Sequence, residues 1–147
     1  METRATGRSK RQTLFILTIG GGLAFWATNF ATSLLPIAAE YRAALSIAYV
    51  PMILVESLLG GMIVGCCVSY FLIRFFDRIP TEDPIAKAEI LSVVALVIAT
   101  VVIQGAASLW VNDGLHYFLI GAMLNVPRFL ILGIAIGYLY KRLYGSA

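Results

Sequence analysis

Four long apolar runs constrain the fold of this chain more than any other feature. Hydrophobic residues dominate residues 14–35, 50–76, 86–111 and 115–141. A helix of about 20 apolar residues, rising about 1.5 Å per residue, crosses the ~30 Å hydrocarbon core of a bilayer. Because lipid bonds no backbone N–H or C=O group, a single run must be helical there. The sequence therefore predicts an all-α integral membrane protein, a bundle of four transmembrane helices.

The composition agrees with this class and argues against others. Hydrophobic residues make up 60 % of the 147 residues and charged residues 13 %, whereas soluble domains have about 45–50 % and 25 %. The net charge is +3, but the basic residues flank the apolar runs, so no nucleic-acid partner is expected. The chain lacks a serine/histidine/aspartate set, a cysteine and histidine cluster and large loops. We therefore expect no enzyme activity, catalytic residue, cofactor or metal.

The distribution of the basic residues predicts the orientation in the membrane. Four spans place both termini on the same side. Nine of the eleven Lys and Arg residues fall on that side: Arg4, Arg8, Lys10, Arg11, Arg74, Arg78, Lys87, Lys141 and Arg142. The positive-inside rule then predicts cytoplasmic N- and C-termini. Residues 1–13 are expected to be a basic cytoplasmic tail before a membrane domain of residues 14–144, in a multi-pass protein of the inner or plasma membrane.

The connections between the spans are short. Pro36 is expected to end the first span, and the sequence leaves open whether residues 36–49 include a helix in the membrane interface. Asp83 followed by Pro84 is typical of an N-cap and the first turn of a helix. Glu89 then complements the positive end of that helix.

Small residues recur at helical spacing along the apolar runs. They are Gly20, Ala24 and Thr28 in the first run, Ser57, Gly61, Gly65 and Ser69 in the second, and Gly133 and Gly137 in the fourth. Lipid provides no hydrophobic drive for helix association, so such faces predict close helix contacts. These contacts fit one chain as well as several. The expected partners are therefore the lipid bilayer and either further copies of the chain or other membrane subunits.

Two charged residues lie well inside apolar runs, and they have opposite signs: Glu56 in the second and Arg128 in the fourth. Either charge alone in hydrocarbon costs at least ~3 kcal/mol on insertion scales. Both runs lead from outside to inside, with estimated depths of roughly 8–14 Å for Glu56 and roughly 20 Å for Arg128. A long arginine side chain pointing back along its helix closes much of that gap. An ion pair between the two is therefore geometrically feasible.

Other polar residues extend this candidate intramembrane site. Pro127 removes the amide partner of the Met123 carbonyl and predicts a kink. Asn125 shares a helix face with Arg128. Asn29 and Gln104 lie towards the outer side of the first and third runs, where they would extend a polar cluster.

Two functions fit these residues. In the first, the chain is a transporter or channel subunit in which Arg128 favours an anionic or carboxylate substrate and Glu56 carries a proton. In the alternative, it is an accessory or assembly subunit of a membrane complex, and the Glu56–Arg128 ion pair is structural. A water-filled pathway touching both residues would favour transport, and a dry interior would favour the accessory role.

Overall fold

The regular structure of the chain is helical in the computed structural model, which describes residues 9–46 and 50–145. The helices are α1 (Lys10–Ser33), α2 (Pro36–Ala44), α3 (Val50–Phe75), the 3₁₀ turn η1 (Phe76–Arg78), α4 (Pro84–Ala99), the π-helical turn η2 (Thr100–Gln104), α5 (Gly105–Ser108) and α6 (Gly114–Tyr144). Four helical segments are long and apolar enough to cross a membrane: Lys10–Ser33, Pro51–Arg78, Pro84–Ser108 and Gly114–Tyr144. This finding confirms the prediction of four long apolar helices.

Capping side chains set the beginnings of two helices. The Ser9 hydroxyl accepts a hydrogen bond from the Gln12 amide at 3.4 Å, so α1 begins at Lys10. Residues 10–13, predicted to belong to the tail, are therefore the first turn of α1, and residues 1–8 of that tail lie outside the described residues. The Asp83 carboxylate accepts from the Ala86 amide at 3.2 Å, which confirms the predicted N-cap of α4.

The connection after the first span contains a helix. Pro36 is the first residue of α2, where its missing N–H leaves no acceptor unpaired. One face of α2 packs against α6, because buried Ala38 contacts the buried side chains of Ile120 and Leu124. The sequence alone did not decide whether this connection contains a helix. Residues 47–49 of the connection are outside the described part.

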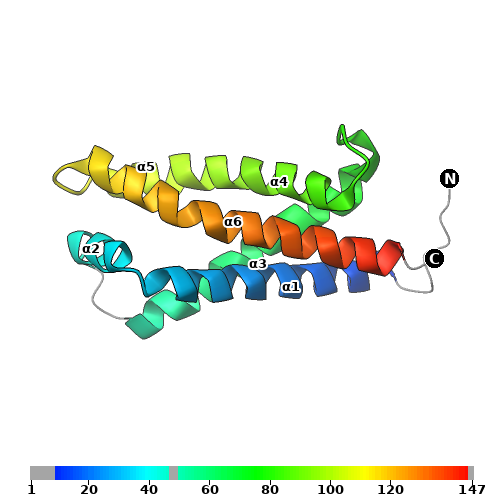
Figure 1. Ribbon diagram of the computed structural model, residues 1–147, viewed down its shortest axis with the longest axis horizontal. Helices are drawn as coiled ribbons and strands as arrows, with labels where there is room; N and C mark the ends of the chain where they lie inside the picture. The colour runs from blue at the N-terminus through cyan, green and yellow to red at the C-terminus, as the bar shows by residue number, and fades with distance from the viewer. Residues whose placement is uncertain (1–8, 47–49, 146–147) are drawn as a thin grey trace.

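The four long helices are not arranged as a symmetric square. α1 packs along both α3 and α6, and α4 packs along α6. Figure 1 shows that α3 crosses behind α1 and α6, so that its beginning lies on the far side of α1 from α6. The start of α1 and the end of α6 meet at one end of the bundle, where the Tyr144 hydroxyl bonds Thr13 at 3.3 Å. We call this the termini end, and the opposite end, which holds α2, the α2 end.

Glycines allow the helices to approach closely within the chain. A methyl group on Gly65 would lie 3.1 Å from the Thr18 carbonyl oxygen of α1, and one on Gly61 would lie 3.0 Å from the Gly22 carbonyl oxygen. A methyl group on Gly137 would lie only 2.5 Å from the Cα of Ile85 in α4. The residues of the predicted packing faces that meet another helix of the same chain in this way are Gly20, Gly61, Gly65, Gly133 and Gly137. These faces therefore hold the bundle itself together.

The other members of the predicted faces have different surroundings. Ser69 is completely buried in α3. The Thr28 hydroxyl donates to the Ala24 carbonyl of its own helix, and the Ser57 hydroxyl donates to the Leu54 carbonyl of α3. Such bonds to the preceding turn satisfy a hydroxyl in lipid without a second helix.

Candidate functional site

Arg128 points from α6 towards the last turn of α1. Its Nε donates to the Thr32 hydroxyl at 3.4 Å, and its Nη1 donates to the Asn125 side-chain oxygen at 3.2 Å. Asn125 is buried, with 8 % of its surface exposed. The three-residue spacing of Asn125 and Arg128 places both on one face of α6, as predicted. The arginine is thus held between two helices by neutral oxygen atoms.

A second arginine reaches the same end of α1. Arg42 of α2 donates from Nη1 to the Ser33 carbonyl oxygen at 3.1 Å. Ser33 is the last residue of α1, and the carbonyl end of a helix carries a partial negative charge that attracts cations. The C-terminal turn of α1 therefore holds Arg42 and Arg128 together, although each is a full positive charge.

Tyr41 and Gln104 close the site on the side of α2. The Tyr41 hydroxyl donates to the Gln104 side-chain oxygen. Gln104 ends the π-helical turn η2 and lies against Gly121 of α6, where a methyl group would be 2.2 Å from its oxygen. Only a residue without a side chain leaves room for the amide there. The amide is thus held between α2 and α6.

Asn29 lies one turn before Thr32 on the buried side of α1. Only 3 % of its surface is exposed, and its Nδ2 finds no hydrogen-bond acceptor among the described residues. The Thr32 hydroxyl, which accepts from Arg128, donates to the Asn29 carbonyl at 3.1 Å. Leaving a buried amide unpaired costs about 1–3 kcal/mol. An acceptor that entered the site and bonded this N–H would remove that cost.

Burial changes the acidity of Tyr41. Its half-buried position raises the pKa of the phenol above the ordinary value of 10.0, against smaller lowering effects of the Gln104 hydrogen bond and the Arg128 charge. A raised folded-state pKa means that the stability due to the neutral phenol is complete below pH 10.0 and is lost as pH rises through the folded value. The neutral phenol is therefore the form that closes the site at physiological pH.

We expect Tyr41→Phe to weaken the alkaline loss of stability. At neutral pH the variant should be less stable by about 1 kcal/mol, because the Gln104 hydrogen bond is lost. As the pH rises above about 10, however, its thermal midpoint should fall less than that of the parent, since no phenol ionises at this position. Thermal unfolding in detergent measures both effects, with Tyr138→Phe, which alters an exposed tyrosine, as the control. An equal alkaline fall in parent and Tyr41→Phe would contradict this account.

Glu56 does not belong to this site. The buried positions of α3 begin at Gly61, and Glu56 is exposed in the preceding half of the helix. The ion pairs of the described part are His116–Glu40 at 3.9 Å and Lys141–Asp83 at 3.6 Å, and neither contains Glu56 or Arg128. The feasible Glu56–Arg128 pair is therefore absent. The depths along the two helices allowed it, but α3 packs on α1 and its beginning is turned away from α6.

A double-mutant cycle tests this separation. We expect the changes in unfolding free energy of Glu56→Gln and Arg128→Gln to add within about 0.5 kcal/mol in the double variant, as for residues that share no partner. Unfolding of all four proteins in one detergent measures the coupling. If the double variant recovered several kcal/mol of the stability lost by the single changes, the result would contradict the separation and support a Glu56–Arg128 ion pair.

A different acid faces the interior. The Oε1 of Glu89 is buried without a hydrogen-bond partner among the described residues, and a methyl group on Gly133 of α6 would lie 2.8 Å from it. One turn further, the Ser92 hydroxyl donates to the Phe129 carbonyl. The sequence analysis interpreted Glu89 only as an acid that complements the positive end of its helix. The helical spacing of Glu89, Ser92 and Thr100 was a signal for a polar face towards α6.

Of the residues in the predicted site, the structure thus places Arg128, Asn125 and Gln104 near the end of α1 and α2, with Asn29 beside them. Pro127 lies inside α6, immediately before Arg128. Sequence reasoning missed Thr32, Tyr41 and Arg42. Tyr41 and Arg42 follow Glu40 in the otherwise largely apolar connection, and this run of three polar residues was the available signal.

Compared with family models, with curated proteins and with solved structures, the chain has no match. The arrangement of its own residues must therefore carry the argument for function.

Proposed function

We propose that the chain is a small transporter or channel subunit of the cell membrane that binds an anion at Arg128. One observation carries the proposal: Arg128 lies inside a helix that is long and apolar enough to cross a membrane, and its hydrogen bonds to the described residues are all to neutral oxygens. A guanidinium has five N–H donors, and the hydrogen bonds of Arg128 within residues 9–46 and 50–145 use its Nε and Nη1. Donors therefore remain for a ligand.

The neighbouring groups favour an anion over a cation. Arg42 brings a second positive charge to the same turn of α1, and the buried Nδ2 of Asn29 is an unused donor. A carboxylate suits this set, because its two oxygens accept paired bonds from a guanidinium. A positively charged substrate would meet repulsion from both arginines.

The irregular helices around the site provide a route for movement. Pro127 interrupts the hydrogen bonding of α6 next to Arg128, and Gln104 is the last residue of the π-helical turn η2. Such turns are frequent at functional sites. We propose that α2, joined to α1 through Leu34 and Leu35, covers the site from the outer side and moves aside to admit the anion. This orientation follows the predicted cytoplasmic position of both termini.

An efflux assay tests the proposal. Vesicles that contain the purified protein should release chloride or succinate faster than protein-free vesicles, while their release of potassium should not change. Release of both anions at the protein-free rate would contradict transport by this chain alone.

A second function is favoured by Glu56. An exposed acid in a membrane-spanning helix lacks a partner of opposite charge in the described part of the chain, and a basic residue of another subunit would supply one. In this alternative the chain is an accessory or assembly subunit. It would then release no anion by itself, and Glu56→Gln would weaken its assembly.

A further inference from the structure

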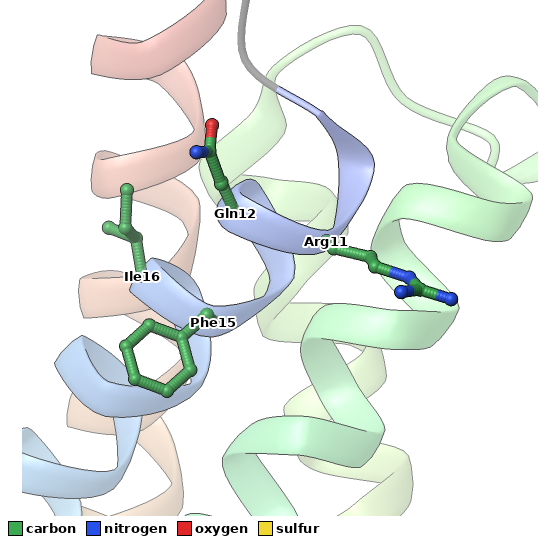
Figure 2. A pocket seen from close by; sticks show the side chains of 4 residues that line it. All are labelled: Arg11, Gln12, Phe15 and Ile16. Carbon is green, nitrogen blue, oxygen red and sulfur yellow. The ribbon is translucent and has the colours of Figure 1, made fainter.

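An open surface cavity, lined by the first turns of α1 alone, lies at the termini end, at the opposite end of α1 from Thr32 and Arg128. Its volume is ≈ 410 Å³, and it is lined by Arg11, Gln12, Phe15 and Ile16. Figure 2 shows these four side chains leaving the first turns of α1, with Arg11 extended away from α6. The cavity therefore combines a charge, an amide and two apolar side chains within a short length of helix.

The order of these residues matches the depth profile of a membrane. Arg11 and Gln12 come first in α1, and Phe15 and Ile16 follow one turn further into the span, about 6 Å deeper. The side chain of Phe15 is 67 % exposed, which suits contact with lipid chains. A molecule that fills this cavity meets polar donors at the membrane boundary and apolar surface below it.

Arg11 has no acid beside it in the first turn of α1. The guanidinium group of Arg11 forms no hydrogen bond or ion pair within the part of the chain that the structure describes. The same end carries further cations in the last turns of α3 and α6, namely Arg74, Lys141 and Arg142, of which Lys141 is paired with Asp83. No partner among residues 9–46 and 50–145 uses the N–H donors of the Arg11 guanidinium, so these donors can meet an anionic group.

We infer that this cavity binds an anionic phospholipid, with the phosphate on Arg11 and Gln12 and an acyl chain along Phe15 and Ile16. Arginine suits a phosphate because its fork of donors pairs with two oxygens. Basic residues beside membrane-spanning helices attract anionic headgroups in this way. The inference does not depend on anion transport at Arg128.

Lipid titration of the purified protein in neutral detergent tests the inference. The probes are phosphatidylglycerol, which is anionic, and phosphatidylcholine, which is zwitterionic, with bound lipid counted by native mass spectrometry. Arg11→Gln should weaken phosphatidylglycerol binding about five- to tenfold, as expected for the loss of one charge-assisted contact. Lys10→Gln removes the same charge from a neighbouring residue outside the cavity lining and should change binding less than about twofold.

Two further variants distinguish a bound lipid from a bound phosphate ion, and this site from the one at Arg128. Phe15→Ala should weaken phosphatidylglycerol binding but leave any binding of inorganic phosphate unchanged, because only the lipid contacts the ring. Arg128→Gln should bind phosphatidylglycerol like the parent, which separates this site from the proposed transport site. Equal losses in Arg11→Gln and Lys10→Gln would show a diffuse basic surface and overturn the inference. Displacement of the lipid by an equal concentration of inorganic phosphate would also overturn it.

Discussion

Arg128→Gln should remove anion release from vesicles while leaving the helical bundle folded. The variant keeps a polar, though shorter, side chain but loses the positive charge and the paired donors. Hydrogen bonds to charged groups contribute about 1.5–3 kcal/mol, so the release rate should fall about ten- to a hundredfold. Arg128→Lys keeps the charge without the planar fork of donors, so its release rate should lie between those of the parent and Arg128→Gln. The measurement is chloride and succinate efflux at equal protein content.

Glu56→Gln is the matched control for this experiment. It also removes one charge from a helix that is apolar enough to cross a membrane, but Glu56 is exposed and lies outside the site, so efflux should remain at the parent rate. Helical circular dichroism and size-exclusion chromatography show whether each variant is folded. Efflux through folded Arg128→Gln at the parent rate would contradict a transport role for this arginine.

Gly137→Ala should strongly destabilise the bundle. The added methyl group would lie 2.5 Å from the Cα of Ile85 and 3.0 Å from the carbonyl oxygen of Pro84. Because both atoms belong to the backbone of α4, no side-chain rotation relieves the contact, and α4 and α6 must separate. Overpacking of this kind costs about 1–3 kcal/mol, and the loss of the neighbouring contacts between the helices adds to it. Denaturant-induced unfolding in detergent measures the change.

Gly60→Ala is the control for the intrinsic effect of replacing glycine in a helix. A methyl group on Gly60 meets no atom within 4 Å, so this variant should gain up to about 1 kcal/mol from helix propensity alone. The difference between Gly137→Ala and Gly60→Ala then isolates the cost of the α4–α6 contact. Equal stability of the two variants would mean that the helices are not in close contact at Gly137.

The long apolar runs were sufficient to predict the four main helices, because lipid leaves a single run little alternative to helical structure. Their boundaries were less certain. The run beginning at residue 14 did not show that the Ser9 cap extends α1 back to Lys10. The π-helical turn at Thr100–Gln104 had no signal in the apolar pattern, since Val, Ile and Thr suit either winding in this environment.

The candidate site was predictable where its members share a helix. Asn125 and Arg128 are three residues apart, and helical geometry alone places them on one face. The predicted contact between Glu56 and Arg128 was wrong because these residues lie on different helices. A sequence gives the depth of a residue along its own helix, but the lateral order of helices depends on which faces pack, and α1 lies beside both α3 and α6. Tyr41 was missed because the position of α2 depends on the contact of Ala38 with α6.

The π-helical turn has a consequence for how the third span tolerates changes of length. A π-type hydrogen bond encloses one more residue than an α-type bond, so Thr100–Gln104 holds one residue beyond the requirement of a regular α-helix. A single deletion before Gln104 would be absorbed by rewinding this turn, with Gln104 still facing Gly121. The same deletion in α6 would rotate Arg128 away from α1. Single-residue deletions should therefore be accommodated at this turn and excluded from α6.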